Sequence, residues 1–207
     1  MNGGELVSFG SGICKGLYHL NGNSNDDSGN GFNGTDTSVS YGLGYGKLSQ
    51  GVLTSGGTSN IDIGAHLTAA QGTILWWMKP VTITNLMRPW SDVGGYLYVE
   101  FNASNQVRAV IYDGAGKTTG YVDLSTSSRD QWGVTWDSST LKLYKNGFLS
   151  ASVAAGAIAD VSNSVWIGGI TTVFANVEVD EFILLNAALT QIDMAKYYTY
   201  ARGGMMV

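Results

Sequence analysis

The sequence predicts an all-β protein, a two-sheet antiparallel sandwich of jelly-roll type with one short C-terminal helix. Three observations support this prediction. Strand signals are short and alternate in polarity, turn residues separate them at even spacing, and only one segment has helical spacing. The 207 residues are 44% hydrophobic and only 13% charged, so a sizeable core is possible and Gly, Ser, Thr and Asn must cover much of the surface.

The strands expected in the first half of the chain are short runs that end at Gly, Asn, Asp or Pro. The strongest is TILWWMKP, because it combines β-branched and aromatic residues and stops at Pro80. These strands are expected at residues 16–20, 47–54, 60–64, 73–80, 94–102 and 106–113.

The second half continues the same pattern through residues 118–124, 130–153, 164–169 and 176–186. In WGVTW, the side chains of Trp132, Val134 and Trp136 fall on one face of a strand. The pair Asn146–Gly147 stands between two alternating runs, which is the strongest short-range signal for a β-hairpin.

The single predicted helix covers residues 189–201, where Thr190 and Asp193 have the spacing of a capping box. Since there is no internal repeat, charge block or Pro/Ser linker, residues 15–202 are expected to form one domain. Residues 1–14 are expected to be an N-terminal arm and residues 203–207 a C-terminal tail, and such arms either hold other subunits or fray.

Four segments occur in a recognisable order: GLYHLNGNSNDDSGNGFNGT (16–35), TILWWMKP (73–80), DQWGVTWDSSTLKLYKNG (130–147), and SVWIGG followed by VEVDEFILLNAALTQIDMAKYY. Together they resemble the laminin-G-like, or concanavalin A-like lectin/glucanase, jelly-roll domains of phage and bacterial surface proteins. The resemblance spans about residues 16 to 200. It implies a twisted sandwich of two antiparallel sheets, on which related proteins bind sugars, bind proteins or serve as structural modules.

The resemblance also implies a structural Ca²⁺ that ties the Asn/Asp/Gly-rich loop at residues 21–36 to the last long strand. Oxygen ligands for it would come from Asp26, Asp27, Asn30 and Asp180. The loop lacks the residue order of an EF-hand. The alternative is a cluster of turns held together by its own side-chain hydrogen bonds, with no metal.

A ligand-binding surface is expected at the loop MRPWSDVGG, where Trp90 is the best candidate for an exposed aromatic platform. Arg88 and Asp92 stand beside it as polar partners. The other five tryptophans lie within predicted strands, and most of them are expected in the core. The alternative for Trp90 is a side chain packed against the edge of the sandwich.

The segment EVDEF is a candidate enzyme motif, because some glycoside hydrolases of this fold carry three spaced carboxylates on one strand. Period two places Glu178 and Asp180 on one face and Glu181 on the other. Phe182 and Ile183 occupy the positions of the missing third carboxylate, so the second catalytic group is absent. The sequence therefore predicts that the protein is not an enzyme.

The charge pattern excludes some partners. The net charge is −5 and there is no Lys/Arg run, so nucleic acid is not an expected partner. No apolar run is long enough for membrane insertion, and MNGGELVSFGSG lacks the features of a signal peptide.

Two functions are consistent with these features. The first is a non-catalytic structural or adhesive module, such as a phage virion decoration, spike or tail-associated protein. It would sit on a virion or an extracellular surface, associate with itself or with other virion or surface proteins, and bind glycans as candidate ligands. The alternative is a free-standing, calcium-dependent, lectin-like carbohydrate-binding module.

Overall fold

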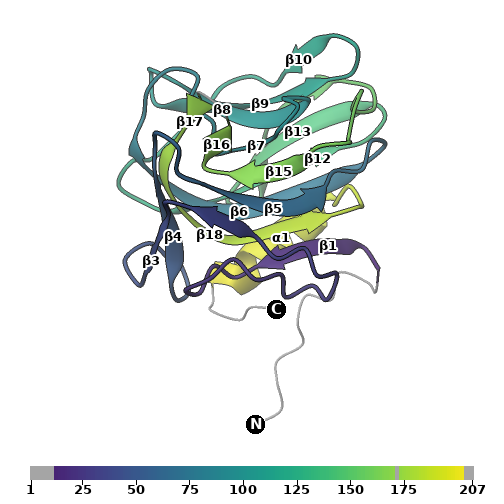
Figure 1. The fold of residues 1–207 in the computed structure, drawn as a ribbon. Coiled ribbons are helices and arrows are strands. Elements are labelled where there is room, and N and C mark those ends of the chain that lie inside the picture. The colour runs from purple at the N-terminus through teal and green to yellow at the C-terminus, as the bar shows by residue number, and fades with distance from the viewer. Residues whose placement is uncertain (1–11, 171–172, 203–207) are drawn as a thin grey trace.

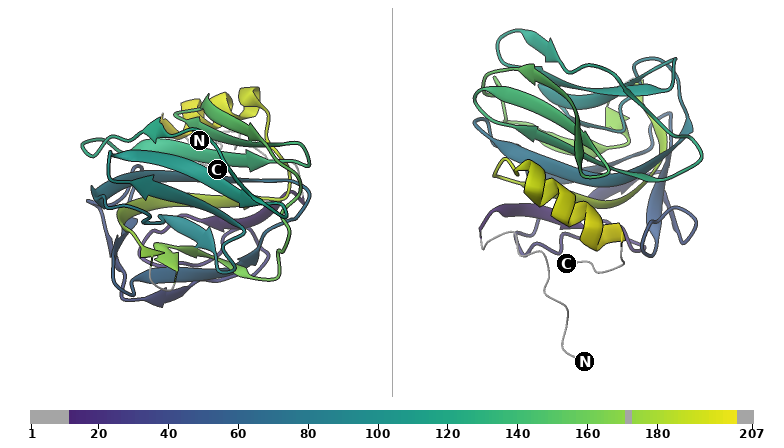
Figure 2. Two further views of the ribbon diagram at one scale, coloured as in Figure 1. Left: turned by 90° about the horizontal axis from the view of Figure 1, so that it is seen from above. Right: turned by 180° about the vertical axis from the view of Figure 1, so that it is seen from behind.

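The chain folds into two antiparallel β-sheets that pack face to face, with one helix across the back (Figures 1 and 2). The structure is a computed structural model that describes residues 12–170 and 173–202. Of the predicted N-terminal arm, only residues 12–14 are described, and the predicted tail lies outside the described residues. The all-β sandwich with one short helix is confirmed.

The first sheet carries the helix. Its strands, in spatial order, are β14 (Phe148–Ala154), β13 (Thr140–Lys145), β12 (Asp130–Trp136), β6 (Gly72–Thr82), β18 (Asn176–Leu185), β4 (Gly51–Ser55) and β3 (Ser40–Gly42). A further strand, β1 (Cys14–Tyr18), pairs with the C-terminal half of β18.

The second sheet forms the opposite layer. Its strands, in spatial order, are β10 (Gly116–Thr118), β9 (Gln106–Tyr112), β8 (Leu97–Asn102), β7 (Trp90–Asp92), β15 (Ser164–Ile167), β5 (Asn60–His66) and β2 (Thr35–Thr37). The short strand β11 (Val122–Asp123) pairs with β9, while β16 (Gly169–Ile170) and β17 (Val173–Phe174) pair with each other.

The core lies between the two sheets and is filled from both by alternate residues. Trp132, Val134 and Trp136 are fully buried there, as the period-two pattern predicts. The predicted hairpin is also confirmed, since Asn146 and Gly147 both have positive φ angles and connect β13 to β14.

The helix α1 (Gln191–Arg202) lies on the outer face of the first sheet (Figure 2, right). Its capping box is confirmed: the Thr190 N–H donates to the Asp193 carboxylate at 3.1 Å, and the Asp193 N–H donates to the Thr190 hydroxyl at 3.3 Å. Met194 and Tyr197 pack on Trp77 in a second apolar cluster. Among the described residues, no helix has the length and hydropathy needed to span a bilayer.

Candidate functional site

A row of side chains crosses the outer face of the second sheet, at right angles to the strands. Strand pairing matches Thr35 with Asp62, Asp62 with Trp166, Trp166 with Ser91, and Ser91 with Tyr98. Residues paired across neighbouring strands point to the same face of a sheet. Asp62, Trp166 and Tyr98 are each flanked on both sides by core residues, so these side chains face outward, and so do the residues paired with them.

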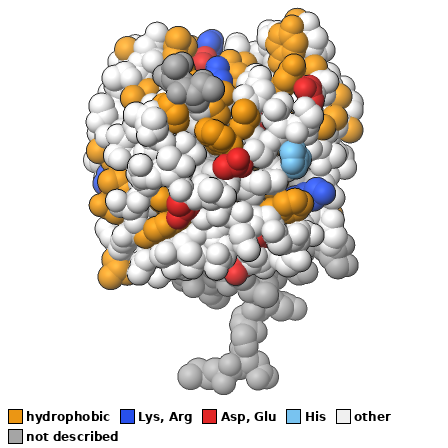
Figure 3. All heavy atoms as spheres, in the orientation of Figure 1, with side chains coloured by type: hydrophobic (Ala, Val, Ile, Leu, Met, Phe, Trp, Pro, Cys, Tyr) orange, Lys and Arg blue, Asp and Glu red, His pale blue; other side chains and the backbone are white. Residues whose placement is uncertain are grey.

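One half of this row forms a groove of about 440 Å³, which lies within the range of about 300–1,000 Å³ that small-molecule sites occupy. Trp166 is only partly buried there. The groove is lined by Thr35, Thr37, Thr58, Asn60, Asp62, Trp166 and Phe174. In the face shown in Figure 3, acidic and hydrophobic side chains lie next to each other over β5 and β15, surrounded by mostly uncharged surface.

The polar groups of the groove are held in place by the fold. One oxygen of Asp62 accepts a hydrogen bond from the Gly64 N–H at 2.9 Å, and the Asn60 amide nitrogen donates to the Thr58 carbonyl at 2.9 Å. Within the described part of the chain, no side chain bonds to the second Asp62 oxygen or to the Asn60 side-chain oxygen. These acceptors are therefore fixed in position, with Asp62 partly exposed to solvent and Asn60 only 6% exposed at the floor of the groove.

The chemistry of the groove suits a polyhydroxylated ligand. A sugar ring has an apolar face of C–H groups, which an indole ring can cover, and a rim of hydroxyl groups, which need both donors and acceptors. The three threonine hydroxyls supply both roles, while Asn60 and Asp62 supply acceptors. Asp62 is the one carboxylate in the lining, so the groove lacks the pair of carboxylates that glycoside hydrolysis requires.

The expectation that Trp90 forms an exposed platform is wrong. The segment expected to be a loop is strand β7, and the alternation within it turns Trp90 inward, where its side chain is 0% exposed. Its ring packs edge-on against Trp76, with centroids 5.5 Å apart, and against Phe182 at 6.4 Å. Trp90 is therefore a core residue.

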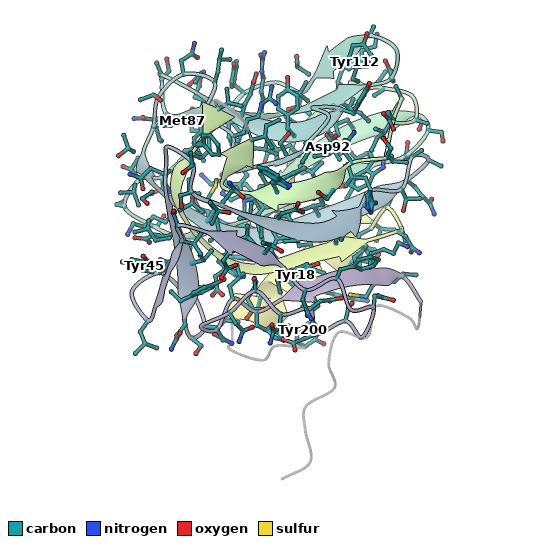
Figure 4. All side chains as sticks on the ribbon, viewed as in Figure 1. Tyr18, Tyr45, Met87, Asp92, Tyr112 and Tyr200 are labelled. Carbon is teal, nitrogen blue, oxygen red and sulfur yellow. The ribbon has the colours of Figure 1, made fainter. Side chains whose placement is uncertain are left out.

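Asp92 and Arg88, the two predicted partners of Trp90, lie in different environments. Asp92 is also buried, and one of its oxygens accepts a hydrogen bond from the Leu97 N–H at 2.6 Å, which fixes the turn between β7 and β8 (Figure 4). Burial raises the pKa of the Asp92 carboxyl group. Arg88 is partly exposed, with its guanidinium carbon 3.6 Å from the centre of the Tyr98 ring.

Trp166 was missed as a site residue because it was grouped with the strand tryptophans expected in the core. The segment SVWIGG contains the signal that places it outside. Val165 and Ile167 are both fully buried, so strict alternation turns the residue between them outward.

The Asn/Asp/Gly-rich loop covers the free edge of β1. The Asp26 carboxylate accepts hydrogen bonds from the N–H groups of Leu17 at 3.1 Å and Phe32 at 3.0 Å. The Asn30 amide donates to the Cys14 carbonyl at 2.9 Å. Burial raises the pKa of Asp26, but the hydrogen bonds outweigh that effect and the net pKa is lowered. The loop thus satisfies edge groups that could otherwise pair with another strand.

The four predicted calcium ligands do not form one site. Asp26 and Asn30 cap the edge of β1, while Asp180 is fully buried and accepts hydrogen bonds from the N–H groups of Lys47 at 2.6 Å and Leu48 at 3.2 Å. Asp27 faces His19 instead. Across residues 12–170 and 173–202, no group of three or more His, Cys, Asp or Glu side chains is arranged to hold a metal ion. The geometry does not fit the implied Ca²⁺ and agrees with the self-bonded turn cluster.

A β-bulge changes the faces of the carboxylates on β18. Val179 and Phe182 both belong to the core, and Glu181 has a φ of 52°, so Asp180 and Glu181 both lie on the outer side of the first sheet. The prediction that Glu181 points to the opposite face from Asp180 is therefore wrong. Burial raises the pKa of Asp180 to about 6.

Each carboxylate of this group is held by its own partners. Glu178 forms ion pairs with Lys79, at 3.0 Å, and with Arg129. Glu181 bonds to His19, in the segment after β1. The three carboxylates are buried on the outer side of the first sheet, in the layer opposite the groove.

Comparisons with known proteins agree with this architecture. The family model described as "Concanavalin A-like lectin/glucanases superfamily" matches residues 55–195. No curated protein matches the chain at a significant level.

Several solved structures share the fold at low sequence identity. The botulinum neurotoxin type G receptor-binding domain has a TM-score of 0.72 and 17% identity, over 92% of this chain and 52% of that one. The binding domain of Paraclostridial mosquitocidal protein 1 has a TM-score of 0.73 and 15% identity, over 91% of this chain and 52% of that one. This chain therefore spans about half the length of the two toxin chains.

A third neighbour is similar in length. Domain 4 of AbnA, a GH43 extracellular arabinanase from Geobacillus stearothermophilus, was solved in complex with arabinotriose. It has a TM-score of 0.66 and 18% identity, over 89% of this chain and 97% of that one. Identities this low show a common fold.

Proposed function

This chain belongs to the concanavalin A-like lectin/glucanase superfamily, and from that premise we propose that it is a non-catalytic carbohydrate-binding module. Its ligand is an oligosaccharide that lies in the groove of the second sheet, with one sugar ring on Trp166. The side chains of Thr35, Asn60 and Asp62 hydrogen-bond to the hydroxyl groups of that sugar.

The observation that carries this proposal is the position of Trp166. All six tryptophans lie in the described residues, and five of them are at most 2% exposed in the core or under the helix. Trp166 is the exception, and it stands in a hollow lined by hydroxyl, amide and carboxylate groups. A large apolar ring that is kept at a polar surface is typical of a binding site.

Three neighbours in fold support the same function. The AbnA domain was crystallised with arabinotriose, and the toxin domains are named as receptor-binding or binding domains. The carboxylates of β18 support the non-catalytic part of the proposal, because each is buried and held by its own partners away from the groove.

An oligosaccharide array followed by calorimetric titration of the hits tests the proposal. Trp166→Ala should weaken binding at least tenfold, whereas Trp166→Phe should keep part of it. Tyr112→Ala is the matched control, since Tyr112 is a partly exposed aromatic residue at the β9–β10 corner of the same sheet, outside the groove lining (Figure 4). An array without hits, or a Trp166→Ala variant that binds like the wild type, would contradict the proposal.

A second candidate role, as a component of a virion or another particle surface, is favoured by an apolar patch on the helix side. Phe148 and Ile192 are each 66% exposed and Tyr200 is 40% exposed. These three side chains line one hollow between α1 and β14. We propose that a second copy of the chain covers this patch in such an assembly. Native mass spectrometry should show an oligomer that Ile192→Glu disrupts, and a wild-type monomer at all concentrations would contradict this role.

A further inference from the structure

The row of outward side chains continues past the groove. Ser91 is paired with Trp166 on one side and with Tyr98 on the other. Neighbouring strands are about 4.8 Å apart, so Trp166 and Tyr98 are about 10 Å apart across the sheet. The residue between them is small and fully buried. The two partly exposed aromatic side chains are therefore two platforms about 10 Å apart, and the serine between them is covered.

Arg88 places a positive charge beside the second platform. Its guanidinium carbon lies 3.6 Å from the centre of the Tyr98 ring, and this stacking fixes the plane of its hydrogen-bond donors. Its backbone forms an isolated β-bridge with Phe174, whose side chain lines the groove. The guanidinium therefore stands next to the groove, on the side away from Asp62.

Arg88 interacts electrostatically with the buried Asp92 carboxylate, whose oxygen accepts the Leu97 N–H. Among the described residues, however, Arg88 forms no ion pair within 4.0 Å. Arg108, on the same face, provides the contrast. It lies 4.8 Å from the centre of the Tyr121 ring, but it is 2.6 Å from the Glu100 carboxylate. Both arginines stack on a tyrosine ring, but only the guanidinium group of Arg108 is held in an ion pair.

We infer that the groove binds a glycan of at least two residues, with an uncharged sugar on Trp166 and a sugar that carries a carboxylate or sulfate group next to Tyr98, where Arg88 binds it. This inference rests on the proposed function and names the ligand class of that site. A six-membered ring built from bonds of about 1.5 Å spans only about 5 Å, so one sugar cannot cover both platforms. The orientation follows from charge, because Asp62 repels an anionic group at its end and Arg88 attracts one at the other.

The experiment uses an array of matched oligosaccharides that differ only in charge. Uronic acid oligomers are compared with their neutral methyl esters, and sulfated oligomers with their unsulfated forms. The wild type should bind the anionic member of a pair about tenfold more tightly, because hydrogen bonds to charged groups are stronger than neutral ones. This preference should decrease as salt is raised, since partly exposed charges are screened.

Arg88→Gln should reduce binding of the anionic member to about the level of the neutral member, so that the tenfold preference is lost. Arg108→Gln is the matched control and should keep the preference. Equal or tighter binding of the neutral members by the wild type, or a preference that Arg88→Gln retains, would overturn the inference while the proposed function stands. If no member of any pair binds, the inference and the proposed function both fail. The salt dependence is measured on the wild type and is independent of whether the variants fold.

Discussion

The Nδ1 atom of His19 lies 2.7 Å from a carboxylate oxygen of Glu181, and this contact ties the segment after β1 to the bulge of β18. Asp27 also faces this histidine, with a carboxylate oxygen 3.9 Å from Nε2. The hydrogen bond to Glu181 is the main cause of a raised pKa for His19, and burial opposes it. The pair therefore joins the N-terminal loop to the last strand by a charge interaction.

This pair predicts a pH-dependent part of the stability. A histidine whose folded pKa is raised stabilises the fold fully below its ordinary pKa of 6.5, and the effect is lost as pH rises through the raised value. His19→Gln should lower the free energy of unfolding by about 1–2 kcal/mol at pH 5.5 and by less at pH 9. Urea denaturation at both pH values measures the difference, and an equal loss at both would argue against the pair.

Removing the charge of Asp180 should stabilise the protein, whereas removing His19 destabilises it. Burial raises its folded pKa from 3.8 to about 6, so the wild type loses stability as pH rises between these values. Asp180→Asn keeps an oxygen for the two backbone N–H groups and should be more stable than the wild type at pH 7, by at most about 3 kcal/mol. Thermal melts at pH 4 and pH 7 check this, and a gain that does not change with pH would refute the explanation.

Asp26 should be needed for the edge cap, whereas its neighbour should not. Asp26→Ala removes the acceptor of three backbone N–H groups and should cost about 2–3 kcal/mol at pH 7. Because the folded pKa of Asp26 is lowered, its contribution is present above pH 3.8 and is lost as pH falls through the folded value. Asp27→Ala is the control and should cost less. Chemical denaturation of both variants makes the comparison.

Calcium should have little effect on stability. The residues expected to bind it are used separately by the fold, at the β1 edge and under the 47–48 loop. An ion that binds only the folded state would raise the melting temperature by mass action. Melting curves in millimolar calcium and in EDTA should therefore coincide, and a rise of several degrees with calcium would show that the loop binds it after all.

The two tryptophans with contrasting positions should respond differently to truncation. Trp90→Ala leaves a cavity among fully packed rings and should cost about 3–5 kcal/mol. Trp166→Ala removes a partly exposed ring and should cost less than about 1.5 kcal/mol, although it should weaken sugar binding at least tenfold. Denaturation curves and titrations on both variants separate stability from binding, and comparable losses of stability would place Trp166 in the core.

The parts of the fold that local pattern determines were predicted from sequence. Period-two alternation identified Trp132, Val134 and Trp136 as one buried face, and the pair Asn146–Gly147 gave the hairpin. The sequence does not predict the short strand β7, because Pro89 and Gly94 closely flank it and only its pairing with β8 and β15 makes it a strand.

The candidate site was harder to predict, because it depends on contacts between distant segments. Trp166 and Asp62 are neighbours only through the pairing of β15 with β5, and sequence spacing does not reveal that register. Sequence spacing does not reveal the bulge at Glu181 either. One extra residue there reverses the face to which the later residues of β18 point. The sequence identifies Asp26 as an important oxygen ligand. Whether its carboxylate accepts hydrogen bonds from N–H groups or binds a cation is decided by how the loop lies on β1.

Both ends of the described chain belong to the same layer of the sandwich. At one end β1 pairs with β18 in the first sheet, and at the other α1 packs on the outer face of that sheet (Figures 1 and 2). The groove opens on the outer face of the second sheet, in the opposite layer. A tether, bead or fluorophore attached at β1 or α1 therefore starts in the layer opposite the groove, so immobilisation from that layer presents the groove to the solution.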